Sequence, residues 1–265
     1  MLMSQIWNGG MVMGKVIAVS NQKGGVTKTT STYNISTALT LRGKRVLQID
    51  LDAQSNLTIS TGFNPVDFEK TIVDVFDNDK EILNSIYGVE DIWNLSLLPA
   101  HPYLAGTELK LMNQMNREKK LSKALNHIKG LFDFVLIDCP PQLSLITINA
   151  LAVADLILIP CECSQLSYFA LDTLFDTLQG VKEELNENLE VLGVIATLYD
   201  SRTLIDKYVL ESLQSKYEVL GVIKRTVAAK RGLQKGLPVV LTEPNSDIAM
   251  EYKKIADKII EKVGI

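Results

Sequence analysis

Lys23-Gly24-Gly25-Val26-Thr27-Lys28-Thr29-Thr30 follows an apolar run at residues 16–20 and precedes residues 31–41, for which the sequence predicts a helix. Paired glycines let the backbone turn tightly and bring its N–H groups close to a phosphate. The helix that begins there adds unsatisfied N–H groups and the positive end of its dipole. The stretch therefore predicts a phosphate-binding loop between a buried strand and a helix.

The Lys-Thr pair near the end of this loop carries the expected chemistry. Lys28 can reach the β- and γ-phosphates of a nucleotide, and the Thr29 hydroxyl can hold Mg²⁺. The spacing departs from the common P-loop, G-x-x-x-x-G-K-[ST], because Gln22 and Thr27 occupy its two outer glycine positions. The pattern K-G-G-x-x-K-[ST] fits instead, with the additional lysine Lys23 at its start. The alternative is a chance Gly-Gly turn near lysines, against which the flanking strand and helix argue.

Two further segments lead from buried strands into aspartates. Residues 45–50 form a predicted strand that ends at Asp50, and Asp52 projects on the same side of an extended chain. Apolar residues 134–137 lead directly into Asp138, an arrangement that is a weak signal alone but that, beside a phosphate loop, indicates a carboxylate for Mg²⁺, usually through water. Open α/β sheets bind their ligands at the carboxyl ends of the parallel strands, so these carboxylates are expected near the loop. A solvated acidic turn is the alternative for Asp50 and Asp52.

Strands and helices alternate along the chain, with the loop directly after the first strand. This order predicts an α/β fold of the P-loop NTPase type, a single doubly wound, mostly parallel sheet with helices on both faces. We expect one domain over residues 14–265 and a flexible extension over residues 1–13. Residues 104–128 are expected to be helical, with an apolar stripe of candidate buried positions. These positions are Leu109, Met112, Leu121, Leu125 and Ile128.

Composition limits the class of protein. The 265 residues are 46% hydrophobic and 22% charged, which is ordinary for a globular domain. The net charge of −4 means that any nucleic-acid surface must be a local patch. Three cysteines without a secretory leader indicate a reducing cytoplasm, and no apolar run approaches the ~20 residues that span a bilayer. Cys161 and Cys163 form a lone C-x-C, more typical of buried thiols than of a metal site.

The most basic stretch lies near the carboxyl terminus. Five cations fall within twelve residues that include no acidic residue: Lys224, Arg225, Lys230, Arg231 and Lys235. Lysine and arginine spread over one surface bind phosphates of nucleic acid without reading its sequence. A solvated charged face is an equally good interpretation from composition alone.

Several of these strings together resemble the ParA/MinD family of ATPases. The loop at residues 23–30 resembles the family's deviant Walker A motif, and residues 50–56 resemble its first switch, D-x-D-x-Q. The string Ile137-Asp138-Cys139-Pro140-Pro141 and residues 149–155 and 198–203 resemble the ParA branch. The resemblance covers residues 14–265.

The resemblance implies an ATPase that binds ATP and Mg²⁺ and hydrolyses ATP slowly without a partner. Lys23 would be the signature lysine, which reaches across a nucleotide-sandwich homodimer to the partner's phosphates. Asp52 would orient or activate the attacking water, and Asp50 would help to organise the metal site. The family usually carries glycine at the position of Thr27.

The resemblance also implies biological partners. The dimer would bind double-stranded DNA non-specifically through the basic stretch, with Arg202 as a further candidate for DNA or dimer contact. Hydrolysis stimulated by a ParB-like or small centromere-binding protein would release it during plasmid or chromosome partition. The expected location is the cytoplasm, in association with the nucleoid.

Two other functions remain open from the sequence. A MinD-like ATPase that cycles on membranes is one, but the last predicted helix mixes lysines with acidic residues and is a poor lipid anchor. The other is a nucleotide-dependent regulator or scaffold that hardly hydrolyses ATP, which Thr27 suggests because a β-branched residue tolerates positive φ poorly.

Overall fold

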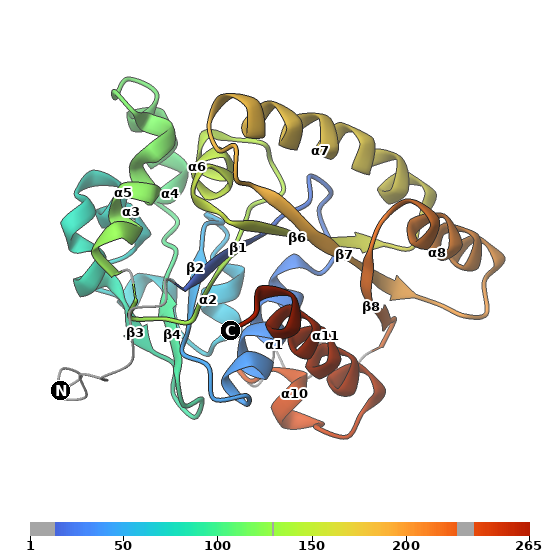
Figure 1. Cartoon of the computed structure of the whole chain (residues 1–265). Coiled ribbons are helices and arrows are strands. Elements are labelled where there is room, and N and C mark those ends of the chain that lie inside the picture. Colours follow the sequence, from blue (N-terminus) through green and yellow to red (C-terminus); the bar gives the residue numbers. More distant parts are fainter. Residues whose placement is uncertain (1–13, 129, 227–235) are drawn as a thin grey trace.

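The computed structural model describes residues 14–128, 130–226 and 236–265. Their strands form one eight-stranded sheet in the order β3-β4-β2-β5-β1-β6-β7-β8 (Figure 1). The strands are β1 Lys15–Val19, β2 Val46–Asp50, β3 Tyr87–Gly88, β4 Leu95–Leu98, β5 Phe134–Asp138, β6 Leu156–Glu162, β7 Glu190–Tyr199 and β8 Val219–Lys224. Among the described residues, the strands pair in parallel except for the edge strand β3, which pairs with β4 in antiparallel fashion. The predicted mostly parallel α/β fold is confirmed.

Helices cover both faces of the sheet (Figure 1). One layer consists of α1 Lys28–Thr40, α2 Asn56–Ser60, α10 Val239–Thr242 and α11 Asp247–Val263. The other consists of α3 Ile72–Asp77, α4 Leu104–Leu111, α5 Lys120–Leu125, α6 Leu145–Val153, α7 Gln165–Glu184 and α8 Leu204–Lys216. Short 3₁₀ turns occur at η1 Pro65–Asp67, η2 Asp79–Ser85, η3 Arg117–Lys119 and η4 Asn126–Ile128. The buried apolar side chains of the described residues form two clusters, one under each layer.

The centre of the sheet brings the predicted carboxylates together. Strands β2 and β5 are buried at every position, as expected for parallel strands covered on both faces. Their register pairs Asp50 with Asp138, and β1 pairs Val19 with the same aspartate. The carboxyl ends of β1, β2 and β5 therefore lie together at the edge of the sheet from which the phosphate-binding loop emerges.

The prediction of one helix over residues 104–128 is wrong in its extent and, in part, in which residues are buried. Helix α4 ends at Leu111, and Asn116 has φ of +53°, which interrupts the helical path before η3. Helix α4 turns Leu104, Thr107 and Leu111 toward the core, so Leu109 and Met112 are 67% and 51% exposed. The other predicted positions, Leu121, Leu125 and Ile128, are buried as expected.

The last helix packs onto the domain. Helix α11 lies against α1 and β8, and its apolar stripe is buried. The buried residues of the stripe include Ile248, Tyr252, Ile255, Ala256 and Ile259. Ser246 caps its first turn by accepting a hydrogen bond from Ala249 N at 3.3 Å. Among the described residues, no helix combines the length and the apolar character that crossing a membrane requires.

The flexible extension that we expect at residues 1–13 lies outside the described residues.

Candidate nucleotide-binding site

The loop between β1 and α1 is shaped by two residues in the left-handed region. Gly25 has φ of +78°, and Thr27, which precedes α1, has φ of +67° and ψ of +28°. Gly24 and Gly25 are exposed, and a Cβ added to either would meet nothing within 4 Å among the described residues. The loop thus presents its backbone to open space, as a phosphate-binding nest requires.

Two buried polar side chains hold this loop on the neighbouring strands. Asn21 donates from Nδ2 to the Pro160 carbonyl at 2.8 Å and accepts from Lys23 N at 2.9 Å. Thr197 on β7 donates from Oγ1 to the Val26 carbonyl at 3.1 Å. The Asn21 and Thr197 side chains reach partners 139 and 171 positions away, so sequence reasoning missed both anchors.

Lys28 lies folded into the loop. It is the first residue of α1, it is 8% exposed, and its Nζ donates to the carbonyls of Asn21 at 3.1 Å and Lys23 at 3.3 Å. Burial lowers the pKa of this ammonium, an effect that the nearby Asp138 carboxylate opposes. An ammonium that donates to neutral loop carbonyls is well placed to exchange them for the stronger hydrogen bonds of phosphate oxygens.

Thr29 and Asp138 are brought into direct contact. The Thr29 Oγ1 donates to Asp138 Oδ2 at 2.6 Å, and Thr32 Oγ1 lies 3.4 Å from the other carboxylate oxygen. Burial and the neighbouring charge of Asp50 raise the pKa of Asp138, and burial also raises the pKa of Asp50. Carboxylates that are costly to ionise when buried favour a bound cation, because the cation balances their charge.

Asp50 organises the segment that carries Asp52. Its Oδ2 accepts from Thr58 N at 2.9 Å and from Thr58 Oγ1 at 2.8 Å, and its Oδ1 accepts from Asp52 N at 3.1 Å. Asp52 is only partly buried, and its Oδ1 accepts from Gln54 N at 2.9 Å. Thr58 was not anticipated, because its role arises from α2 folding back over the end of β2.

These residues fit a nucleotide with Mg²⁺. Hydroxyl and carboxylate oxygens are hard ligands that Mg²⁺ accepts, and it usually takes its remaining ligands from phosphates and water. Among the described residues, no cluster of three His, Cys, Asp or Glu side chains could hold a metal ion. The pair Thr29 and Asp138 therefore suits a cation that arrives with phosphate oxygens rather than an all-protein metal centre.

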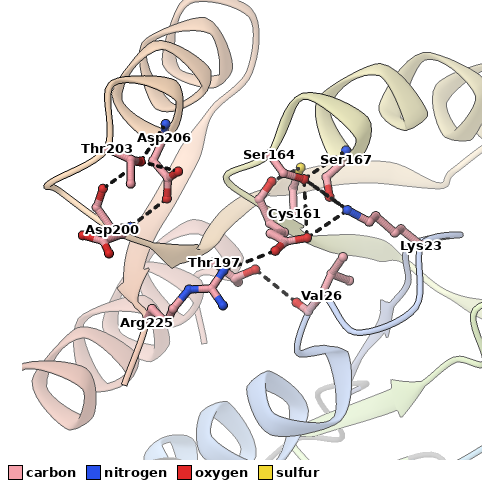
Figure 2. A network of polar contacts seen from close by, with 11 residues as sticks. Lys23, Val26, Cys161, Ser164, Ser167, Thr197, Asp200, Thr203, Asp206 and Arg225 are labelled. Atoms are coloured by element: carbon pink, nitrogen blue, oxygen red, sulfur yellow. Dashed lines mark hydrogen bonds and ion pairs between the residues drawn. The ribbon is translucent and has the colours of Figure 1, made fainter. Parts of the chain in front are cut away.

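Lys23 points away from the loop toward the beginning of α7 (Figure 2). Its Nζ donates to Glu162 Oε2 at 2.8 Å, to Ser167 Oγ at 2.8 Å and to Ser164 Oγ at 3.1 Å. The other oxygen of Glu162 lies 3.5 Å from Arg225 Nη2. The sequence offered no local sign of this arrangement, because Glu162 lies 139 positions from Lys23 and between two cysteines that suggested only a weak metal motif.

The three cysteines behave as buried thiols. Cys139, Cys161 and Cys163 are at most 3% exposed. Burial raises the pKa of Cys161 and of Cys163 to about 12, so neither is a thiolate near neutral pH. This agrees with the interpretation of the C-x-C string as part of the core.

The described candidates for DNA contact lie at or just after the carboxyl ends of β7 and β8, and each contacts a carboxylate. Arg202 pairs with Asp200 at 2.7 Å, and its side chain is 87% exposed. Lys224 pairs with Asp247 at 3.0 Å, and Arg225 contacts Glu162. Arg225 N also donates to the Tyr199 carbonyl at 3.0 Å, which ties the β8 end to the β7 end. Lys230, Arg231 and Lys235 lie outside the described residues.

Thr27 is strained, and relief of that strain is testable. The left-handed conformation costs an L-residue roughly 1–2 kcal/mol, and Thr27 Oγ1 is buried without a hydrogen-bond partner among the described residues. Thr27→Gly is expected to raise the free energy of unfolding by about 1 kcal/mol, after the entropy that glycine loses on folding. The melting temperature of the nucleotide-free protein should rise by roughly 2–4 °C.

Thr27→Ala is the matched control for this prediction. It removes the hydroxyl and the β-branch but retains the Cβ that disfavours positive φ, so its gain should be smaller. A Thr27→Gly protein that melts below the unsubstituted protein would contradict the assignment of strain.

Comparison with known proteins identifies the family. The family described as an AAA domain (AAA_31) matches residues 14–191. The sporulation initiation inhibitor protein Soj of Bacillus subtilis strain 168 is 36% identical over 250 residues, which cover 93% of this chain and 98% of Soj. The chromosome partitioning protein ParA of Myxococcus xanthus is 35% identical over 257 residues, covering 96% and 90% of the two chains.

Solved structures agree with this result. Cobyrinic acid a,c-diamide synthase from Mycobacterium smegmatis, with bound ADP and magnesium, is 35% identical with a TM-score of 0.82, covering 96% of this chain and 97% of that one. MinD from Pyrococcus horikoshii, complexed with Mg-ADP, is 25% identical with a TM-score of 0.80, covering 95% and 98%. From the matched motifs, the coverage and the shared fold, this chain belongs to the ParA/Soj family of P-loop ATPases.

Proposed function

We propose that this chain is a ParA-type partition ATPase whose loop at residues 23–30 binds ATP with Mg²⁺. The observation that carries the proposal is the 2.6 Å contact between Thr29 and Asp138 beside the buried ammonium of Lys28. A hydroxyl, a carboxylate and a lysine at the open end of a glycine loop match what Mg²⁺ and the β- and γ-phosphates require. Structures of the related synthase and of MinD, solved with nucleotide and magnesium, support the same ligand.

Each residue has a proposed part in hydrolysis. Lys28 and the loop N–H groups hold the phosphates, and Thr29 and Asp138 hold the metal ion, directly or through water. The bound Mg²⁺ would supply charge neutralisation at the transferred phosphoryl group. Asp52 orients the attacking water. Asp50 positions Asp52 by accepting a hydrogen bond from the Asp52 backbone N–H. Positioning and electrostatics are the main contributions that a protein makes to phosphoryl transfer.

The nucleotide controls assembly in this proposal. With ATP, two copies form a sandwich dimer. In it, Lys23 gives up its contacts near the start of α7 in its own protomer and contacts the partner's phosphates, so ATP shifts the population toward the dimer. The dimer binds double-stranded DNA non-specifically because two basic patches then act together. A ParB-like or small centromere-binding protein stimulates hydrolysis and releases the dimer, which works in the cytoplasm on the nucleoid.

Binding to arbitrary duplex DNA tests the proposal. We expect binding with ATP, little binding with ADP or without nucleotide, and a steep loss of affinity between low and moderate salt. Lys23→Ala should abolish the ATP-dependent binding because it removes the proposed contact across the dimer. Lys182→Ala, which removes an exposed lysine near the end of α7, is the matched control and should bind as the unsubstituted protein does.

The contrary outcomes are also informative. If the protein does not bind DNA in any nucleotide state, the basic residues form a solvated face and the proposed role in DNA partition is wrong. A nucleotide-dependent regulator that hardly hydrolyses ATP is the second candidate, because Thr27 adopts a strained conformation at the turn into α1. Turnover at background with DNA and a centromere-binding partner present would favour that function.

A further inference from the structure

We propose that Glu162 is a positioning residue that holds Lys23 against its own protomer and that Arg225 competes for the same carboxylate. The proposal rests on the function above, in which Lys23 must leave this place to serve a partner's nucleotide. We call Lys23, Glu162, Ser164 and Ser167 the lysine latch. The latch sets how readily the signature lysine becomes available.

The contacts of the latch satisfy the ammonium of Lys23 fully. A lysine has three N–H donors, and Lys23 Nζ donates to three oxygens at 2.8–3.1 Å (Figure 2). The side chains of Lys23 and Glu162 are 28% and 22% exposed, so solvent screens the pair only partly. A lysine held in this way must give up all three contacts before it can reach another molecule.

Glu162 supplies most of the attraction that holds the Lys23 ammonium in the latch. Ser164 caps α7 by accepting a hydrogen bond from Ser167 N at 3.4 Å, which places the Lys23 ammonium at the positive end of a 20-residue helix. A cation is disfavoured at a helix amino terminus, and the two serine hydroxyls carry no charge to offset this. The carboxylate of Glu162 is therefore the group that keeps Lys23 there.

Arg225 connects the latch to the basic end of β8. Its Nη2 lies 3.5 Å from Glu162 Oε1, whereas Lys23 uses Oε2. Arg225 directly follows β8, at the start of the basic stretch. Two cations at one carboxylate repel each other, so each is held less firmly than it would be alone. Release of Lys23 would leave Glu162 to Arg225, so the latch links the loop to the candidate DNA surface.

Chemical reactivity of Lys23 tests the latch without nucleotide. A lysine amine reacts faster with an acylating ester when hydrogen bonds and ion pairs do not hold its nitrogen. The full chain is treated with the ester, and mass spectrometry follows the extent of acylation at Lys23. Glu162→Gln keeps the shape but removes the charge, and we expect Lys23 to react about tenfold faster, as for a loss of 1.4 kcal/mol. Arg225→Gln should slow the reaction at Lys23 by about threefold because Glu162 then forms an ion pair with Lys23 alone.

Two references make this measurement specific. Glu187→Gln makes the same charge change beyond the far end of α7, where the glutamate is exposed, and should leave Lys23 unchanged. Acylation of exposed Lys182 reports any general loosening of α7 and should be equal in all variants. An unchanged rate at Lys23 in Glu162→Gln overturns the proposal, and an unchanged rate in Arg225→Gln overturns the sharing.

Self-association with ATP tests the consequence. Each protomer of a symmetric dimer releases one latch, so Glu162→Gln should tighten the ATP-dependent dimer by about tenfold for each latch, up to roughly a hundredfold. In a Lys23→Ala background the same substitution should give no gain, because the two residues act through one contact. A Glu162→Gln dimer no tighter than that of the unsubstituted protein would overturn this role.

The two measurements separate the possible failures. If the unsubstituted protein does not self-associate with ATP, the proposed function fails, while the reactivity of Lys23 still decides whether the latch exists. If it self-associates and Glu162→Gln changes neither measurement, the latch fails and the proposed function stands.

Discussion

Lys28→Met is expected to lower ATP affinity by about a hundredfold with little change in the stability of the fold. Methionine retains the buried stem and removes only the ammonium, which now donates to two loop carbonyls. Charge-assisted hydrogen bonds to phosphate contribute roughly 1.5–3 kcal/mol, and 1.4 kcal/mol corresponds to a tenfold change in affinity. Calorimetric titration with Mg-ATP measures the loss directly.

The stability of the same variant is the internal check. Burial lowers the pKa of Lys28, which means that the folded chain disfavours its charged form. An apolar side chain of similar length removes this cost but leaves the Asn21 and Lys23 carbonyls without their donor, so the melting temperature of the nucleotide-free protein should change little. Lys182→Met is the control for the loss of a lysine. Normal ATP affinity in Lys28→Met would refute the placement of the β- and γ-phosphates at this residue.

Asp52→Asn is expected to reduce ATP turnover by about 10²–10³-fold while ATP still binds. The amide keeps an oxygen that can accept from Gln54 N, but it cannot accept a proton from an attacking water. Single-turnover hydrolysis with DNA present gives the rate of the chemical step, and titration gives the binding. If the proposed cycle is right, the variant should also remain on DNA for longer, because ATP persists.

Asp50→Asn is the instructive contrast to this variant. Asp50 is buried, and both of its oxygens accept hydrogen bonds, including two from Thr58. An amide NH₂ in place of one oxygen would face a donor, so this variant should lose stability as well as turnover. Turnover retained in Asp52→Asn would remove Asp52 from the chemistry and direct attention to another group near the phosphates.

Local spacing was sufficient for much of the site. The Gly-Gly turn, the Lys-Thr pair and the apolar strand before them occur within a few residues, so one stretch specifies strand, loop and helix. Parallel strands gather their carboxyl ends at one edge, which predicts that Asp50 and Asp138 lie together, and the register of β2 with β5 pairs them. Alternating strands and helices likewise predicted the doubly wound sheet.

Amphipathic phase was less informative where apolar residues occur on several sides of a helix. Around α4, Leu104, Leu109, Leu111 and Met112 allow more than one buried stripe, and packing against α3 and α6 selects the one with Leu104 and Leu111. The exposure of Leu109 and Met112 follows from that packing rather than from their own hydrophobicity.

Short spacings and the positions of strand ends in the sequence are enough to predict a phosphate-binding loop, the α/β class of fold and the candidate residues for phosphate and Mg²⁺. The partners of the individual polar side chains depend on the folded structure. Lys23 meets Glu162, Thr197 holds Val26, and Arg202, Lys224 and Arg225 each contact a carboxylate. Most of these contacts join residues far apart in the chain, so the register and packing of the whole sheet create them.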